Sequence, residues 1–191
     1  MATEPIRNKK NIKQLMNYYL EKGNLRNYLL IILGIYTALR DSDLLNIKWG
    51  DVYDFERGEI RTHLNMKEKK TGKSKSIAIN KKAAHALKEY FSAIDGYKSE
   101  GDFIFQNNRK SNAAISRVQA WRIIREAGDA VGIERISCHS LRKTFGYHAW
   151  QAGIPAPVIM DIFNHSSYAV TRRYLGVNQD DRDEVYMNAA F

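Results

Sequence analysis

Apolar residues recur at helical spacing along the first part of the chain. Between Asn11 and Gly23 they occupy one helical face, at Ile12, Leu15, Met16, Tyr19 and Leu20. The next segment, from Leu25 to Leu39, is apolar nearly all round, which predicts a helix buried on every side. A third, short helix is expected to follow, with Asp41 or Ser42 as its N-cap.

The pattern then changes to short apolar segments separated by turn residues. Strands are predicted at Val52–Phe55, Ile60–Leu64 and Ser74–Ile79, because the glycines at Arg57-Gly58 and Thr71-Gly72 separate them. These segments fit one small antiparallel sheet.

Helical periodicity returns from Asn80 onward. Helices are predicted at Lys82–Ile94, Ile115–Val131, Ser140–Gln151, Pro155–Phe163 and Asp181–Ala190, with a short turn after His165. We therefore expect a mainly α protein with a small antiparallel β-sheet (α+β), folded as a single domain over residues 1–191.

Composition narrows the possible partners. Lys and Arg number 30 against 21 Asp and Glu, a formal net charge of +9, which favours a polyanion although a merely basic protein is an equal alternative. The longest apolar run, Tyr28 to Ala38, is shorter than the roughly 20 residues of a membrane-spanning helix. The single cysteine, Cys138, allows no internal disulfide and favours a reducing compartment. We expect no membrane association and a cytoplasmic location.

The basic charge is concentrated in one place. From Arg61 to Lys82 there are eight basic residues and one acidic residue, Glu68. Such a segment is either an ordinary solvated face or a basic hairpin that lies along a phosphate backbone.

A further set of residues becomes informative when it is considered together. It comprises Arg40 in TALRDSDLLNIKWGDV, Lys70 in KKTGK, His139 and Arg142 in HSLR, His165 in FNHSS, and Tyr174 in TRRYLGV. Each has an ordinary explanation when taken singly, since HxxR pairs and lone histidines are common. Arg40 is the exception, because an arginine between a buried helix and a polar cap needs a partner.

Taken in order, this set resembles the catalytic domain of the tyrosine recombinases, the phage integrase family. The matching stretches are TALRDSDLLNIKWGDV, KKTGK, HSLRKTFGYHAWQAG and IFNHSSYAVTRRYLGV. The resemblance extends from about residue 10 to residue 178, and every one of the six positions holds a residue of the type that the family uses.

The resemblance implies transesterification at a DNA phosphodiester. Tyr174 would attack phosphorus and form a 3′-phosphotyrosine, and the 5′-hydroxyl of DNA would leave. Arg40 and Arg142 would bind the non-bridging oxygens through paired N–H donors. The exchange conserves the phosphodiester, so no NTP, metal or other cofactor is expected. The absence of a GxxxxGK[ST] loop and of zinc-ligand spacing agrees with this.

The remaining roles follow from the same resemblance. His139 would accept the tyrosine proton, Lys70 would protonate the leaving oxygen, and His165 would donate to the phosphate. Asp43 would orient Arg40. Tyr168 is a less suitable nucleophile, and Lys67 and Lys69 are alternatives to Lys70.

The chain also departs from the family pattern. Asp43 stands where Glu is most common, Lys143 where many members have His, and Asn164 where Gly is commoner. None of these changes removes a catalytic group. The separate N-terminal core-binding domain of most members is expected to be absent, as in a fragment or a compact invertase.

Partners are predicted from the charge and the resemblance. Candidate DNA contacts are Lys67, Lys69, Lys73, Lys75, Arg109, Lys110, Arg117 and Gln119. The tail from Asp181 to Phe191 ends in apolar residues, and it packs either on its own core or on a neighbouring protomer of a homotetramer assembled on double-stranded DNA.

The expected function is therefore site-specific recombination of bacterial or phage DNA, as in integration, excision or inversion. Two alternatives stay open at this point: a DNA-binding accessory protein with the same fold, and a topoisomerase of type IB that relaxes DNA without a specific site.

Overall fold

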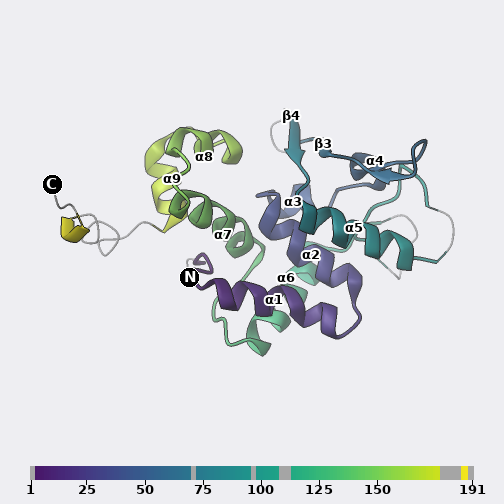
Figure 1. The fold of residues 1–191 in the computed structure, drawn as a ribbon, viewed down its shortest axis with the longest axis horizontal. Coiled ribbons are helices and arrows are strands. Elements are labelled where there is room, and N and C mark those ends of the chain that lie inside the picture. Colours follow the sequence, from purple (N-terminus) through teal and green to yellow (C-terminus); the bar gives the residue numbers. More distant parts are fainter. Residues whose placement is uncertain (1–2, 70–71, 96–97, 108–112, 177–185, 189–191) are drawn as a thin grey trace.

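The computed structural model describes residues 3–69, 72–95, 98–107, 113–176 and 186–188. Helix α1 (Lys9–Glu21) packs against α2 (Leu25–Tyr36). Residues 27–35 of α2 are all buried, which confirms the expectation of a helix enclosed on every side. Helices α5 (Lys81–Ala93), α6 (Arg117–Ala130) and α7 (Cys138–Gln151) also contact α2, so α2 forms the centre of the larger part of the molecule (Figure 1).

The strands form two separate hairpins instead of the single sheet that the sequence predicted. After α3 (Asp41–Leu44) and α4 (Trp49–Val52), β1 (Tyr53–Asp54) pairs with β2 (Glu59–Ile60). Strand β3 (His63–Lys67) pairs with β4 (Ser74–Ala78) in antiparallel register.

The expected strand from Ile60 to Leu64 is interrupted at Arg61. The backbone N–H of Arg61 donates to the carbonyl of Val52, and its guanidinium bonds Gly50 and Asp54. These contacts hold Arg61 on the first hairpin, so the chain turns before β3 begins.

The helices after residue 137 gather at one end of the molecule (Figure 1). They are α7, α8 (Ala156–Phe163) and α9 (Tyr168–Leu175). Helix α9 is longer than the short turn expected after His165, because the Ser167 side chain accepts from the Val170 N–H and caps it. The predicted helix at 181–190 lies largely outside the described residues.

Two apolar clusters stabilise the described fold. The larger one draws on α1, α2, α5 and α6, and a smaller one consists of Ala38, Ile159, Phe163 and Leu175. Helix α7 lies between them, since its Leu141 belongs to the larger cluster. On its other side Gly146 allows a close approach, because a Cβ there would lie 2.5 Å from the Phe163 ring. No helix in the described part of the chain is long and apolar enough to span a membrane.

Candidate active site

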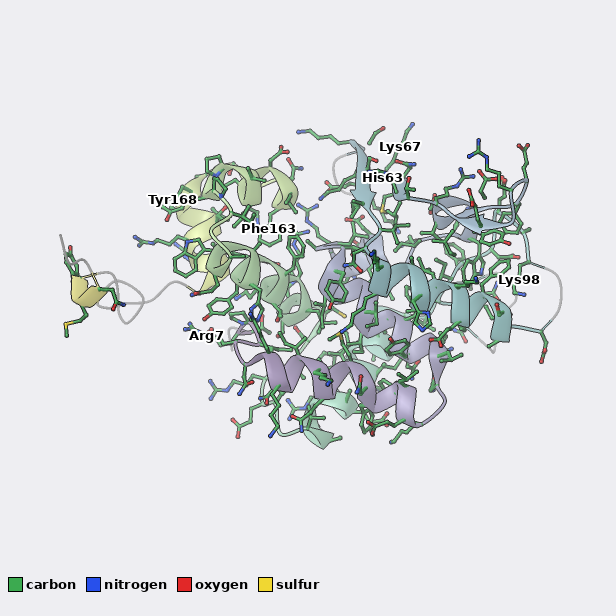
Figure 2. The ribbon with its side chains drawn as sticks, viewed as in Figure 1. Arg7, His63, Lys67, Lys98, Phe163 and Tyr168 are labelled. Atoms are coloured by element: carbon green, nitrogen blue, oxygen red, sulfur yellow. The ribbon has the colours of Figure 1, made fainter. Side chains whose placement is uncertain are left out.

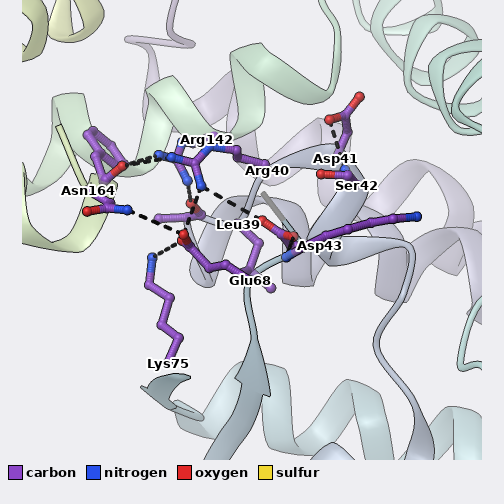
Figure 3. A network of polar contacts seen from close by, with 12 residues as sticks. Leu39, Arg40, Asp41, Ser42, Asp43, Glu68, Lys75, Arg142 and Asn164 are labelled. Atoms are coloured by element: carbon purple, nitrogen blue, oxygen red, sulfur yellow. Dashed lines mark hydrogen bonds and ion pairs between the residues drawn. The ribbon is translucent and has the colours of Figure 1, made fainter. Parts of the chain in front are cut away.

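Arg40 stands between the two apolar clusters, at the N-cap of α3. Its side chain is 21% exposed, and its Nη1 lies 3.1 Å from Oε2 of Glu68 and 3.9 Å from Oδ2 of Asp43. Its Nη2 donates to the carbonyl of Phe163 at 3.4 Å. The predicted first arginine is therefore held by two carboxylates and one backbone carbonyl (Figure 3).

Arg142 is buried on α7, with 2% exposure. Its guanidinium donates to the carbonyl of Ala38 and, at 2.8 Å, to the carbonyl of Phe163. Because Phe163 also accepts from Arg40, the two guanidinium groups converge on one carbonyl oxygen (Figure 3). Residues more than 100 positions apart in the sequence thus meet at one point.

Tyr174 lies in a group of rings at the same place. Its ring centroid is 5.6 Å from that of His139 and 5.0 Å from that of His165. Phe163 lies 5.1 Å from Tyr174 and occupies the space between α7 and α8 (Figure 2). The guanidinium carbon of Arg142 is 5.8 Å from the Tyr174 ring, so the structure brings together every predicted catalytic residue that it describes. Lys70 lies outside the described residues.

The Tyr174 hydroxyl is buried and has no hydrogen-bond partner among the described residues. Burial raises the pKa of Tyr174, and the positive charge of Arg142 opposes this rise. An unpartnered buried hydroxyl is costly, which makes it a strong indication of a site that another molecule completes.

Both histidines are held in the neutral form. Desolvation, together with the positive charge of Arg142, lowers the pKa of His139. Burial beside Arg142 and Arg40 lowers the pKa of His165 to about 4. At neutral pH each ring therefore has one nitrogen that can accept a proton and one that can donate a hydrogen bond.

A buried threonine positions His165. The Nδ1 atom of His165 lies 3.0 Å from Oγ1 of Thr171, and Thr171 is fully buried. If the threonine hydroxyl donates to Nδ1, the ring proton resides on Nε2, which is then free to donate.

The hairpin contributes two residues to the site whose positions the sequence did not show. Glu68 is 3% exposed, and Lys75 Nζ donates to the carbonyl of Ile162 at 2.6 Å and lies 3.4 Å from Glu68. Lys75 was predicted to contact DNA phosphate, but this ammonium points into the protein, and burial lowers its pKa. The signal for Glu68 was its position as the one acidic residue in a basic segment.

The other predicted DNA contacts fall into three groups. Lys67, Lys69 and Lys73 are exposed on the hairpin, and Figure 2 shows Lys67 on its outer side. Arg117 forms an ion pair with Asp41 at 3.1 Å, and Gln119 accepts from the Ser116 N–H as part of the α6 cap. Arg109 and Lys110 lie outside the described residues.

The alternative nucleophile, Tyr168, is 50% exposed at the first position of α9. It lies one and a half turns before Tyr174 on the same helix, so the two residues occupy different faces. No ring contact joins Tyr168 to either histidine among the described residues.

Comparison with known proteins identifies the family of the chain. Residues 7–181 match the model of the phage integrase family. The chain belongs to the phage integrase family. It is 38% identical over 183 residues to the probable integrase/recombinase YoeC of Bacillus subtilis, covering 96% of this chain and 94% of that protein.

The present chain spans only about half the length of some more distant relatives. It is 29% identical to the tyrosine recombinase XerA of Pyrococcus furiosus, where the match covers 87% of this chain but 55% of the relative. Among solved structures, a XerA recombinase superposes with a TM-score of 0.76 at 22% identity, covering 100% of this chain and 67% of the other. XerH bound to a palindromic difH substrate gives 0.77 at 20% identity, with 95% and 51% covered. These structures establish the fold of a tyrosine recombinase catalytic domain.

Proposed function

We propose that this phage integrase family member is a site-specific DNA recombinase that acts through Tyr174. The observation that carries the proposal is the buried Tyr174 hydroxyl, on a ring that lies 5.6 and 5.0 Å from the rings of two neutral histidines and 5.8 Å from the guanidinium carbon of Arg142. The proposal is supported by the similarity to a probable integrase/recombinase over nearly the full length of both chains. The recombinases resolved with difH or transposon DNA support DNA as the substrate.

The two arginines stabilise the phosphorane. Attack by the Tyr174 oxygen on phosphorus forms a P–O bond and places negative charge on the non-bridging oxygens. Arg40 and Arg142 each use part of their guanidinium for backbone carbonyls, and each guanidinium has five N–H donors. These carbonyl contacts hold both guanidinium groups in place before the reaction, which is the preorganisation that electrostatic catalysis requires.

Proton transfer is divided among three residues. The phenolic proton of Tyr174 passes to neutral His139, whose lowered pKa keeps it able to accept a proton at neutral pH. The P–O bond to the 5′-oxygen breaks, and Lys70 supplies the proton that this oxygen needs. His165 donates a hydrogen bond to the phosphate. Attack by a second 5′-hydroxyl reverses these steps and rejoins the strands.

A nicked suicide substrate tests the proposal. With an oligonucleotide that carries the cognate site, we expect a covalent protein–DNA adduct that disappears in Tyr174→Phe. Tyr168→Phe is the matched control, because it removes a hydroxyl from the same helix and should leave the adduct intact. A persistent adduct in Tyr174→Phe, or plasmid relaxation that needs no specific site, would contradict the proposal.

We also propose assembly into a homotetramer on DNA, in the bacterial cytoplasm, through the C-terminal segment. The sequence from Asp180 to Phe191 combines acidic and apolar residues, and Tyr186 and Met187 are 80% and 85% exposed. A pocket of about 560 Å³ between α1, α2 and α7 has a matching character, since it is mainly apolar and has Lys9 and Lys13 among its lining residues. The tail of a second copy fits this pocket by charge and by hydrophobicity.

Sedimentation of the DNA complex tests this assembly. Met187→Asp should lower the mass of the complex, while Lys88→Asp on the surface of α5 should not. A tetramer that persists in Met187→Asp and in a chain truncated after residue 180 would refute the role of the tail.

A further inference from the structure

We infer that Glu68 is the residue that positions Arg40 for phosphate binding, and that Asp43 instead holds the β3–β4 hairpin. This inference deepens the proposed function, because it concerns the same site. It rests on two side chains that reach across the site. Glu68 of the hairpin contacts the Arg40 guanidinium, and Asp43 of α3 contacts the backbone of the hairpin.

The two carboxylates lie at different distances from the Arg40 guanidinium. Oε2 of Glu68 lies 3.1 Å from Nη1 of Arg40, at ion-pair distance but without hydrogen-bond geometry, whereas Oδ2 of Asp43 is 3.9 Å from the same nitrogen. The other oxygen of Asp43 accepts the backbone N–H of Lys69 at 2.9 Å. The shorter aspartate side chain thus engages the backbone of the hairpin, and the longer glutamate reaches back to the guanidinium.

The backbone of Glu68 closes the turn of the hairpin. Its N–H donates to the carbonyl of Lys73 at 2.9 Å, and its carbonyl accepts from the Gly72 N–H at 2.8 Å. One residue therefore fixes the base of the turn whose sequence contains Lys70 and, through its side chain, the first arginine of the site. Through Glu68, Arg40 is thus connected to the backbone of Gly72 and Lys73.

The Glu68 carboxylate is buried next to two cations. Glu68 is 3% exposed, and two cations, Arg40 and Lys75, lie within 3.1 and 3.4 Å of its carboxylate. The amide of Asn164 lies 3.5 Å away (Figure 3). A neutral side chain of the same shape at this site removes the nearer counter-charge of Arg40 and leaves it with the more distant Asp43 carboxylate, so the guanidinium is held less firmly in the direction that it needs for phosphate.

Glu68→Gln tests the inference, since it keeps the shape of the side chain and removes the charge. We expect the single-turnover rate of adduct formation at saturating protein to fall about 10- to 100-fold. The apparent Kd for the nicked substrate should change less than about threefold, because the lost interaction orients a catalytic group and adds little to overall DNA affinity. Glu59→Gln, an exposed glutamate on the neighbouring hairpin, is the matched control and should match the wild type in both.

Two further variants distinguish positioning from a structural role. Asp43→Glu brings a carboxylate one methylene closer to Arg40, so the double variant with Glu68→Gln should recover part of the lost rate. Lys75→Met removes the other partner of Glu68 and should reduce stability more than the rate per folded molecule. If the rates of Glu68→Gln and Lys75→Met both fall only in proportion to their unfolded fractions, Glu68 has no positioning role and the inference is wrong.

A readout without catalysis separates this inference from the proposed function. In ¹⁵N NMR of the intact chain, the guanidinium signals of Arg40 should show restricted rotation in the wild type and in Glu59→Gln, and lose it in Glu68→Gln. Unchanged Arg40 signals in Glu68→Gln would overturn the inference even if the wild type forms the adduct. If the wild type forms no adduct while Glu68→Gln still loses the restricted rotation of Arg40, the proposed function is refuted and this inference is not.

Discussion

The two ends of the active site are supported very differently. Arg40 follows α2, which is buried over nearly its whole length in the larger apolar cluster. Tyr174 lies on α9, whose support in the described structure is a cluster of four buried residues. Local stability follows the amount of buried apolar contact, so the Arg40 end of the candidate site is the more rigid, and Tyr174, the proposed nucleophile, lies on the less stable element.

Arg142 connects these two regions. It donates to Ala38, which follows α2 in the chain and packs in the smaller cluster, and to Phe163 of α8 in the same cluster. Arg142 thus links the segment after α2 to α8, alongside the contacts that Arg40 and Lys75 make with α8, and the comparison can be tested by weakening this contact or either cluster.

The largest effect is expected for Arg142→Met. Removal of the guanidinium should lower the rate of adduct formation by at least about 10²- to 10³-fold. It also removes the Arg142 donor from the carbonyl of Ala38, at a cost of about 1–3 kcal/mol in the free energy of unfolding, and leaves the Phe163 carbonyl with the longer bond from Arg40. Single-turnover cleavage and urea unfolding measure the two losses. Arg125→Met, which breaks an exposed pair with Asp129 on α6, should alter neither, and a stable Arg142→Met protein would contradict the connecting role.

Gly146→Ala should damage the Tyr174 end specifically. The added Cβ would lie 2.5 Å from the Phe163 ring and 2.8 Å from Leu175, so α9 must shift, at a cost of about 1–3 kcal/mol. Cleavage by the folded fraction should fall as well, because Tyr174 moves with α9.

Gly34→Ala is the counterpart in the larger cluster. Its Cβ would meet the side chain of Leu141, a member of the larger cluster, at 2.6 Å. It should reduce stability while the folded fraction retains its cleavage rate. Equal rates per folded molecule in both variants would show that the two regions are not distinct in function.

Acid should destabilise the Tyr174 end first. Burial beside Arg142 and Arg40 holds the pKa of His165 at about 4, below the ordinary value of about 6.5. Between these pH values the unfolded chain binds more protons than the folded one, so stability decreases as the pH falls from about 6.5 towards 4. Tm measured against pH should show this decrease, and His165→Gln should flatten it more than the exposed His85→Gln does. Identical slopes in both variants would exclude His165 as the source.

The smallest effect is expected for Thr171→Val. The loss of the hydroxyl next to Nδ1 removes the preference for a proton on Nε2 but keeps the ring, so the cleavage rate should fall by less than about 10-fold. Measurement of His165 tautomers by ¹⁵N NMR provides the direct check. An unchanged tautomer with an unchanged rate would show that Thr171 serves packing alone.

The sequence predicted elements best where one pattern dominated. The apolar run of α2 and the periodic face of α1 are local properties, and both helices form as expected. The middle segment was harder, because the division into two hairpins depends on the bonds of Arg61 to Gly50 and Asp54. The full α9 was missed since its cap and its burial against α7 and α8 depend on packing.

The residue types of the active site and their order were present in the sequence alone. Arg40, His139, Arg142, His165 and Tyr174 were proposed from the resemblance of their sequence stretches to the phage integrase family, because a motif records which chemical groups the chain carries. The basic charge around the hairpin was equally visible, since composition does not depend on conformation.

What the tertiary structure decided is how these groups face one another. Lys75 and Lys67 are both lysines of the same hairpin, yet Lys75 turns inward to Glu68 and Ile162 while Lys67 is exposed. Glu68 contacts Arg40 across 28 positions, and Arg142 contacts Ala38 across 104. Such pairings depend on which surfaces the apolar clusters bring together, and no local pattern in the sequence specifies them.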